Sequence, residues 1–186
     1  MIPFASHLFT AFGLASASGL NAYIPLLIVA LTARFTNVIQ LNPPCDVLTN
    51  GWVIGALIVL LAIEIVVDKI PAADTINDLI QTFIRPAAGA ILFAASTNVI
   101  GVHPVLAVIL GLILAFGVHA AKATARPVVT ATTGGLGNAF VSVGEDIVAT
   151  GVSLLAIVVP VVIGFLLAVV IVILAWRVFG SKRATA

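Results

Sequence analysis

The chain contains long apolar stretches that carry almost no charge. The longest runs from Ile147 to Phe179, and its only charged residue is Arg177. Hydrophobic residues make up 62% of the sequence and charged residues 8%, whereas soluble domains carry about 25% charged residues. A water-soluble fold of 186 residues cannot bury this much apolar side chain, because small domains leave much of their surface exposed. Lipid is the solvent that removes this problem, so the sequence predicts an all-α, polytopic bundle of membrane helices.

The apolar segments predict about six crossings, since a helix spans the hydrocarbon core with roughly 20 apolar residues. Residues 147–179 are longer than one crossing needs, and Pro160 and Gly164 offer a place to divide them. The expected crossings are residues 5–33, 52–67, 87–97 and 103–121 and the two parts of 147–179. We expect a single transmembrane domain over residues 1–186.

Lysine and arginine indicate the orientation, because they are enriched in cytoplasmic loops. With six crossings and the N-terminus inside, Arg34 falls outside and Arg85 lies within a crossing. The remaining basic residues then face the cytoplasm: Lys69, Lys122, Arg126, Arg177, Lys182 and Arg183. This pattern predicts a multi-pass protein of the bacterial inner membrane with both termini cytoplasmic.

Residues 1–100 and 101–186 form two halves of similar layout. Each half has an apolar segment, a polar stretch, an Arg-Pro pair and a further apolar run, with pairs at Arg85-Pro86 and Arg126-Pro127. Six crossings give the halves opposite orientations, and three-plus-three inverted repeats of this kind are typical of transporters. The alternative is that any two Ala-, Val- and Leu-rich halves look alike, and the sequence leaves both interpretations open.

The first apolar segment is interrupted by Ser18-Gly-Leu-Asn-Ala-Tyr-Ile-Pro25. Glycine, asparagine and proline so close together predict a broken or kinked helix. Asn21 and Tyr23 are therefore expected to line a polar interior. Because no basic segment precedes this stretch, we expect a retained first helix and not a cleaved signal peptide.

A first polar cluster follows the second apolar segment. Glu64 and Asp68 are four residues apart, as are Asp74 and Asp78, so each pair shares a helix face. Like charges repel at that spacing unless a cation or a basic side chain lies between them. The cluster is therefore a cation or substrate site, or a solvated interfacial helix with local counter-ions. Its members are Glu64, Asp68, Lys69, Asp74, Asp78 and Arg85.

A second polar cluster surrounds the stretch Thr132-Thr-Gly-Gly-Leu-Gly-Asn138. Non-helical backbone at membrane depth survives only where it is buried or lines a cavity. The stretch is thus a candidate re-entrant loop or anion cradle, or else a flexible cytoplasmic loop. Arginines 85 and 126 are candidates to pair across the halves with the acidic residues. The members of this cluster are Lys122, Arg126, Thr130, Thr132, Thr133, Gly134, Gly135, Asn138, Glu145 and Asp146.

Several function classes have no support in the sequence. Cys45 is the only cysteine, so neither a disulfide nor a cysteine-based zinc site is expected. His7, His103 and His119 show no metal-ligand spacing, although His119, close to Lys122, is a candidate proton sensor. No catalytic constellation is readable, so we predict no enzyme, metal or cofactor. A net charge of +1 leaves no broad basic face for nucleic acid.

Three stretches carry a resemblance to a known family. They are Ser18 to Pro25, Asp68-Lys-Ile-Pro71 through Arg85-Pro86-Ala-Ala-Gly89, and His119-Ala-Ala-Lys122 through Thr133-Gly-Gly135 to Glu145-Asp146. Together they resemble the 4126 family of domains of unknown function, which are small bacterial membrane proteins. The resemblance covers nearly the whole chain and implies a membrane protein, but it implies no activity. The first stretch also looks like the first helix of the LysE-type exporters, which have three-plus-three inverted repeats.

These observations favour a small-solute or ion transporter or channel-like protein, with a pathway between the halves. The alternative is a non-transporting subunit of a membrane complex, because Gly89, Gly111, Gly117 and Gly151 favour close helix packing. An intramembrane enzyme ranks last. The expected partners are the lipid bilayer and either further copies of the chain or other membrane subunits. The pathway candidates are Asn21, Tyr23, Asp74, Asp78, Arg85, Lys122, Arg126, Thr133, Asn138, Glu145 and Asp146.

Overall fold

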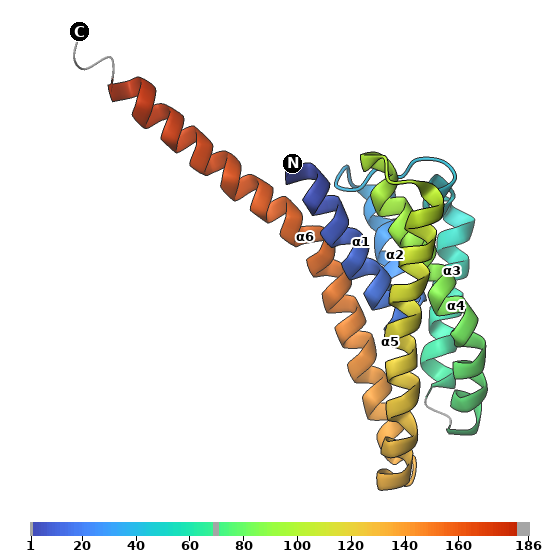
Figure 1. The fold of residues 1–186 in the computed structure, drawn as a ribbon. Helices are drawn as coiled ribbons and strands as arrows, with labels where there is room; N and C mark the ends of the chain where they lie inside the picture. Colours follow the sequence, from blue (N-terminus) through green and yellow to red (C-terminus); the bar gives the residue numbers. More distant parts are fainter. Residues whose placement is uncertain (1, 69–70, 182–186) are drawn as a thin grey trace.

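Figure 1 shows the computed structural model, which describes residues 2–68 and 71–181. Side chains are described for residues 4–68, 76–98 and 100–160. Every regular element in these ranges is a helix, as the sequence predicts. The α-helices are α1 (Ile2–Leu20), α2 (Tyr23–Phe35), α3 (Gly51–Val67), α4 (Pro71–Thr97), α5 (Pro104–Thr133) and α6 (Leu136–Ser181), with short 3-10 helices η1 (Cys45–Thr49) and η2 (Asn98–Ile100).

Three helical segments are long and apolar enough to cross a membrane: Ile76–Thr97, Pro104–Thr133 and Leu136–Pro160. Helices α2 and α3 are apolar but shorter. The outer face of α3 exposes large apolar side chains, which lipid accommodates and water does not; they include Trp52, Ile58, Val59, Ile63 and Val66. The all-α membrane bundle is confirmed on these grounds. The number of crossings, the kind of membrane and the side of each terminus stay predictions.

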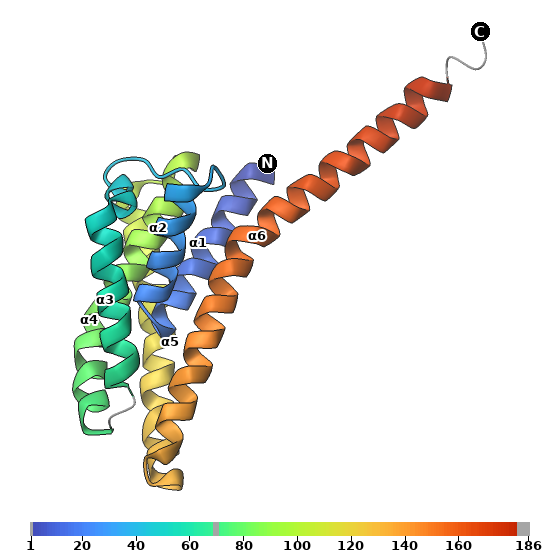
Figure 2. The same cartoon turned by 180° about the vertical axis from the view of Figure 1, so that it is seen from behind.

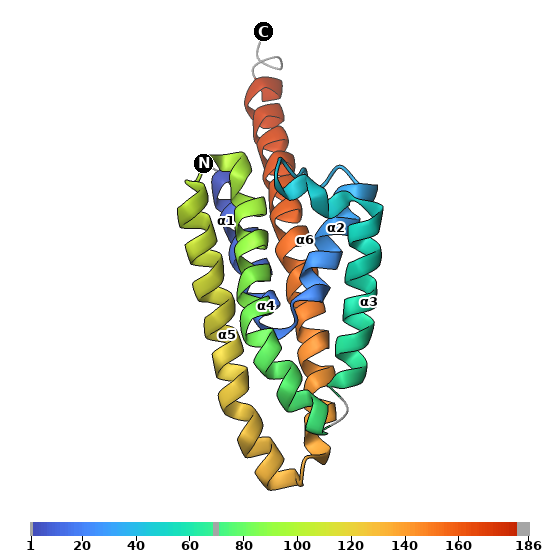
Figure 3. The ribbon, with the colours of Figure 1, turned by 90° about the vertical axis from the view of Figure 1, so that its right-hand side faces the viewer.

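Helices α1 and α2 form a hairpin whose tip lies inside the bundle. Figure 3 shows the chain reversing between Leu20 and Tyr23 part-way along α4 and α5, so that α2 returns to the end where α1 begins. The predicted break is confirmed, but residues 5–33 are not one kinked crossing, and that part of the prediction is wrong. Asn21 explains the reversal, because its Oδ1 accepts hydrogen bonds of 3.0 Å from the backbone N–H groups of both Tyr23 and Ile24. This cap starts a new helix in a new direction.

The hairpin changes the predicted distribution of basic residues. Helix α2 carries Arg34 in its last turn and ends near the N-terminus (Figure 1), so Arg34 does not lie opposite the N-terminus as expected. Lys122 and Arg126 are buried within the bundle and are not loop residues. The assignments of Lys69, Arg177, Lys182 and Arg183 concern side chains outside the described part.

Helix α6 is a single continuous helix from Leu136 to Ser181 with Pro160 in its interior. The predicted division near Pro160 and Gly164 is therefore wrong. A proline removes one backbone N–H from the helix ladder, but membrane helices tolerate this loss because local adjustments satisfy the freed carbonyl. Beyond Pro160 the helix continues past the rest of the bundle, as Figure 2 shows.

The threonine- and glycine-rich stretch is helical on both sides of a tight turn, so the predicted re-entrant or flexible loop is wrong. Helix α5 continues to Thr133, and the chain reverses at Gly134 and Gly135, whose φ angles of 63° and 88° suit glycine. Thr130 and Thr133 donate their hydroxyl protons to carbonyls one turn back, those of Arg126 and Val129. These local bonds let threonine stay inside the helix.

Tight packing of small residues holds α1, α4 and α5 together. A Cβ atom at Gly89 of α4 would collide with Ala115 of α5 and with the Gly111 carbonyl, and one at Gly19 of α1 would meet the Ala115 carbonyl. Close packing is therefore confirmed at Gly89 and Gly111 but is wrong at Gly117 and Gly151, where a Cβ would meet nothing within 4 Å.

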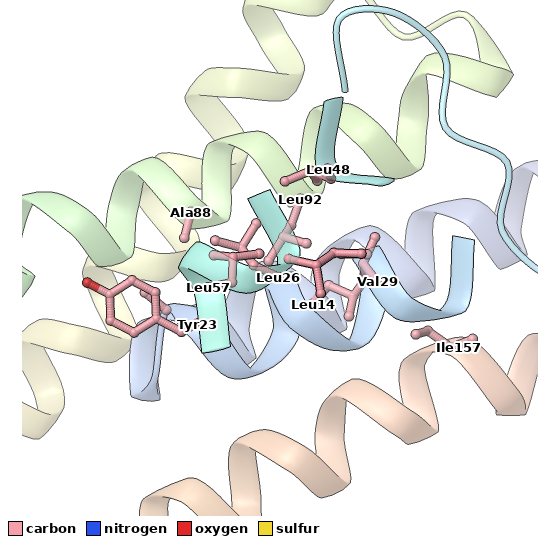
Figure 4. Close-up of a cluster of buried hydrophobic side chains, with 12 residues drawn as sticks. Leu14, Tyr23, Leu26, Val29, Leu48, Leu57, Ala88, Leu92 and Ile157 are labelled. Carbon is pink, nitrogen blue, oxygen red and sulfur yellow. The ribbon is translucent and has the colours of Figure 1, made fainter. Parts of the chain in front are cut away.

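This packing crosses the boundary between the predicted halves. Residues 1–100 contribute α1 to α4 and residues 101–186 contribute α5 and α6, so the described helices do not support a three-plus-three repeat. An apolar core joins the hairpin to its neighbours (Figure 4): it includes Leu14, Leu26, Leu57, Leu92 and Ile157.

Candidate functional site

Polar side chains form one stripe on each of three helices below the hairpin tip. On α4 and α5 successive members are three or four residues apart, and on α6 the two acids follow the serine by three and four residues, which places the members of each stripe on one helix face. The last turns of α3 add two carboxylates to the same region. The stripes are Asp78, Gln81 and Arg85 on α4, His119, Lys122 and Arg126 on α5, and Ser142, Glu145 and Asp146 on α6, and the additions are Glu64 and Asp68. We call the charged members the ionic cluster: Glu64, Asp68, Asp78, Arg85, Lys122, Arg126, Glu145 and Asp146.

Arg126 connects three neighbouring helices to α5. Its Nη1 lies 2.8 Å from Asp78 Oδ2, and its Nη2 lies 3.4 Å from Glu145 Oε2 and 3.7 Å from Asp68 Oδ2. The Arg126 side chain is 7% exposed, so these contacts form largely out of solvent. A guanidinium suits this position because it donates in several directions within one plane.

Arg85 is the most deeply buried charge of the ionic cluster. Its side chain is 0% exposed, and its Nη2 lies 3.1 Å from Glu64 Oε1. Its Nη1 lies 3.7 Å from Asp78 Oδ1 and 3.0 Å from His119 Nδ1. Asp78 thus stands between the two arginines and compensates part of the charge of each.

The hydrogen bonds assign His119 as a neutral ring with its proton on Nε2. Arg85 only donates, so Nδ1 must accept its bond. Thr82 Oγ1 lies 3.0 Å from Nε2 and donates its own proton to the carbonyl of Asp78 at 2.8 Å. Nε2 must therefore donate to Thr82. His119 thus serves as an acceptor that orients Arg85.

The hairpin tip is fastened to α5 and α6 by polar contacts. Asn21 Nδ2 donates to Asp146 Oδ1 at 2.9 Å, and Lys122 Nζ donates to the carbonyl of Leu20 at 3.2 Å. Lys122 also lies 2.8 Å from Glu145 Oε2. A lysine at this place complements the partial negative charge at the C-terminal end of α1.

Asp68 fastens the end of α3 to α4 and α6. Its Oδ1 accepts from Asn77 Nδ2 at 2.8 Å, and its Oδ2 accepts from the Ser142 hydroxyl at 2.9 Å. Together with the Glu64 to Arg85 pair, these contacts hold the inner end of α3 against the rest of the cluster.

The structure brings most of the predicted pathway residues together. Those in or beside the ionic cluster are Asn21, Tyr23, Asp78, Arg85, Lys122, Arg126, Glu145 and Asp146. Tyr23 belongs there through its interaction with the Gln81 side chain. Asn138 lies farther along α6, where it forms hydrogen bonds with Thr130. Thr133 is exposed at the end of α5, and the side chain of Asp74 is outside the described part.

Gln81, Thr82 and Ser142 were missed as site residues, and Glu64 and Asp68 were recognised as charged neighbours but not as pathway candidates. A signal for Ser142 is present in the sequence: polar residues recur at 138, 142 and 145, and spacings of four and three are those of one helix face. Treating residues 128–146 as a loop hid that periodicity.

Carboxylates outnumber the bases in the ionic cluster: Glu64, Asp68, Asp78, Glu145 and Asp146 face Arg85, Lys122 and Arg126. Among the described side chains, the cluster therefore has an excess of acidic groups. Within the described residues, no group of three His, Cys, Asp or Glu side chains is arranged to hold a metal ion.

A family model described as "Domain of unknown function (DUF4126)" matches residues 8–179. The chain belongs to the DUF4126 family. The match takes in the hairpin from residue 8 onward and every member of the ionic cluster, so the hairpin tip and the cluster are features of a DUF4126 protein and not of an appended segment. The family description names no activity. No curated protein and no solved structure matches this DUF4126 chain, and the likeness of its first stretch to the LysE-type exporters stays a prediction.

Proposed function

We propose that this protein is a transporter or channel-like protein of the bacterial inner membrane that moves a small cationic solute or ion. The observation that carries the proposal is the meeting of a buried ionic cluster with a helix hairpin tip inside the bundle. Each charged side chain placed in a membrane costs about 2.5–3.5 kcal/mol on insertion scales. Such residues mark ion and substrate pathways more often than structural glue.

The hairpin tip supplies a feature that discontinuous helices provide in transporters. The ends of α1 and α2 bring a backbone carbonyl and backbone N–H groups to the cluster, and Lys122 and Asn21 already engage them. Transporters place substrate and ion sites at helix ends of this kind. The excess of carboxylates in the ionic cluster favours a positively charged cargo over an anion.

The packing of the helices favours α3, together with α2, as the part that moves. Helices α1, α4 and α5 interlock through Gly19, Gly89 and Gly111, so rocking residues 1–100 against 101–186 would break the tightest contacts of the bundle. Helix α3 packs mainly on α2 and sparsely on α4, and its inner end is held by the polar contacts of Glu64 and Asp68. We therefore propose that access to the cluster changes when α3 moves, together with α2, against the other helices.

Cation flux into liposomes tests the proposal. The full-length protein is reconstituted, and the uptake of protons, Na⁺, K⁺ and a small organic cation is measured under an imposed gradient. Asp78→Asn removes a carboxylate of the cluster, and Asp46→Asn is the matched control because Asp46 is exposed in η1. We expect flux of at least one cation that Asp78→Asn lowers by about tenfold or more, which corresponds to about 1.4 kcal/mol of barrier. Equal flux in both variants, or no flux with folded wild-type protein, contradicts the proposal.

A second candidate function is that of an accessory subunit in a larger membrane complex. The observation that favours it is the part of α6 beyond Pro160, which continues past the bundle (Figure 1). Purification of the full chain in mild detergent distinguishes the two. A different protein present at constant stoichiometry favours the accessory role, whereas the chain alone, as a monomer or as an oligomer of itself, favours transport.

A further inference from the structure

We propose that Glu64 is the proton-binding residue of this protein, and that proton uptake by its carboxylate releases the inner end of α3 from the ionic cluster. This inference rests on the proposed function and names a proton as the ion that the cluster exchanges. The two oxygens of the buried Glu64 carboxylate have different surroundings. Oε1 lies 3.1 Å from Arg85 Nη2, whereas Oε2 is buried and accepts no hydrogen bond within the described residues.

Asp78 also has a buried oxygen without a hydrogen bond, Oδ1, but that oxygen lies 3.7 Å from Arg85 Nη1. Glu64 Oε2 has neither a hydrogen bond nor an ion-pair contact within the described residues. Asp78 contacts both arginines, and Glu145 contacts Lys122 and Arg126. Asp68 accepts from Asn77 and Ser142 and faces Arg126. Glu64 is 2% exposed, and its ion pair with Arg85 is its one basic contact within the described residues. A buried acceptor without a donor raises the free energy of the folded protein. Of these carboxylates, Glu64 is therefore the one that we expect protonation to stabilise most.

Arg85 keeps a counter-ion when Glu64 becomes neutral. Asp78 Oδ1 remains 3.7 Å from Arg85 Nη1, and the same nitrogen donates to His119 Nδ1 at 3.0 Å. The charged and titratable groups around Glu64 are Arg85 and Asp78 on α4, Lys122 and His119 on α5, Tyr23 on α2 and Asp68 on its own helix. Since bases on both α4 and α5 remain paired with other acids, protonating Glu64 leaves no cation of this set without a partner.

Gln81 on α4 supplies another buried oxygen without a hydrogen-bond donor among the described side chains. Gln81 is 1% exposed, and its Oε1 also accepts no hydrogen bond within the described residues. The Tyr23 side chain interacts with Gln81 and senses the charges of Glu64 and Arg85, so these groups share one region of the bundle. In the proposed protonated state, the Glu64 carboxyl O–H donates to Gln81 Oε1. A proton taken up from water would thus turn Glu64 Oε2 from an acceptor without a donor into a donor. It would also give Gln81 Oε1 a hydrogen-bond donor.

A metal cation fits this place less well than a proton. Sodium and divalent ions need several oxygen ligands at once, and no suitable group of three acidic, histidine or cysteine side chains exists in the described part. A proton needs one carboxylate oxygen and one acceptor. In the proposal, Glu64 Oε2 and Gln81 Oε1, two buried oxygens without hydrogen-bond donors in that part of the chain, meet that requirement.

Neutralising Glu64 would loosen α3 because the helix has little else to hold its inner end. Its buried apolar side chains, Ile54 and Leu57, lie in its first half, and Leu61, which is only partly buried, is the last of its side chains that packs against the apolar core. Near its end, Glu64 and Asp68 supply the contacts to α4 and α6. With the ion pair to Arg85 gone, Asp68 alone would fasten this end. The expected result is an opening between α3 and the cluster.

Infrared difference spectroscopy of the full chain in bilayers tests proton binding without any flux. The acid-minus-neutral spectrum should contain the C=O band of a buried protonated carboxyl. Glu64→Gln should remove this band and Gln81→Leu should shift it, because Gln81 is the proposed acceptor. Asp46→Asn, the exposed control, should leave it unchanged. The proposal is overturned if the band is absent from the wild type or survives in Glu64→Gln.

Thiol labelling tests the opening at constant pH. In a Cys45→Ser background, Ser142→Cys places a thiol on α6 beneath the end of α3, and Ser153→Cys places one in α6 where the serine hydroxyl bonds within its own helix. Glu64→Gln mimics the protonated state. It should speed labelling at position 142 by roughly tenfold, since the rate follows the population of the open form, and leave position 153 unchanged. Equal rates at position 142 with and without Glu64→Gln refute the release of α3.

The two proposals fail in different ways. If the infrared band and the labelling behave as expected but no variant or wild type conducts a cation, the proton switch stands and the transport function is wrong. If cation flux is observed but Glu64→Gln changes neither the infrared band nor the labelling, transport stands and the assignment of Glu64 is wrong.

Discussion

Asp78 Oδ2 lies 2.8 Å from Arg126 Nη1, while the other oxygen of the same carboxylate faces Arg85 at 3.7 Å. One carboxylate of α4 thus stands between a guanidinium of its own helix and one of α5. The Asp78 side chain is 18% exposed, more than either arginine. The bridge therefore lies where the buried cluster comes closest to its surroundings.

We predict that Arg126→Ala destabilises the protein more than any exposed arginine substitution does. Removing Arg126 leaves the carboxylates of Asp78, Glu145 and Asp68 without their shared cation, and breaking a buried ion pair costs about 3–5 kcal/mol. Arg34→Ala is the control, because Arg34 is exposed and its Nη1 donates a hydrogen bond of 2.7 Å to the carbonyl of Thr49. Unfolding of both variants in detergent, followed by circular dichroism, measures the difference. Similar midpoints would show that the cluster is hydrated and not buried.

A second prediction concerns the contact of α4 with α5. Gly89→Ala should destabilise the bundle, because its Cβ would collide with Ala115, the Gly111 carbonyl and the Ser18 hydroxyl; overpacking of this kind costs about 1–3 kcal/mol. Gly117→Ala on α5 meets open space and should be neutral or stabilise the helix by up to about 1 kcal/mol. Thermal unfolding measures whether the midpoint falls in Gly89→Ala and stays the same or rises in Gly117→Ala. A neutral Gly89→Ala would mean that α4 and α5 lie farther apart than described.

A third prediction concerns the hairpin tip. Asn21→Ala removes the cap of α2 and leaves Asp146 without its donor. Asn50→Ala removes a cap at the exposed start of α3, where Asn50 Oδ1 accepts from the Trp52 N–H at 2.8 Å. Asn50→Ala, which removes the exposed cap, should lower the free energy of unfolding by about 1 kcal/mol. Asn21→Ala should lower it further, because an unsatisfied buried polar group costs about 1–3 kcal/mol, and more when it is charged. Comparing the free energies of unfolding of the two variants measures the excess. Equal losses would place the tip in solvent.

A fourth prediction uses Cys45, the only cysteine of the chain. Burial, and secondly the neighbouring Asp46 carboxylate, raise the pKa of the Cys45 thiol above its ordinary value. The reactive thiolate is therefore scarce at neutral pH, and labelling by a maleimide should accelerate as the pH rises toward that pKa. Asp46→Asn should increase the rate at a given pH by lowering the pKa. A labelling rate that levels off at or below the ordinary thiol pKa would contradict a raised pKa.

The same thiol reports the sidedness of the bundle. Cys45 lies in η1 between α2 and α3, at the end of the bundle that holds the N-terminus, and the turn between α5 and α6 lies at the other end (Figure 3). In sealed vesicles, a membrane-impermeant maleimide should reach Cys45 from one side. In a Cys45→Ser background it should reach Leu136→Cys, an exposed position at that turn, from the other side. Labelling of both from the same side would contradict the arrangement of α3, α4 and α5.

The sequence was sufficient for the bilayer and for the identity of most charged residues in the cluster. The scarcity of charge and the spacing of three or four residues between Asp78, Gln81 and Arg85 and between His119, Lys122 and Arg126 are visible without coordinates. The sequence was insufficient at the interruptions. Asn21, Pro160 and the Thr-Gly stretch each mark a local departure from a regular helix, and a local departure is compatible with a kink, a turn or no break at all.

Hydropathy and side-chain periodicity are properties of neighbouring residues, so the sequence by itself determined that the chain is a helical membrane protein with polar stripes on particular helix faces. Which stripes meet is decided by packing between residues far apart in the chain. The collision-free contact of Gly89 with Gly111 sets α4 against α5, and the reversal at Asn21 brings the ends of α1 and α2 to Lys122 and Asp146. Only the tertiary structure could place Glu64 beside Arg85 with one oxygen left unpaired, because that pairing depends on how three helices pack and on no feature of α3 alone.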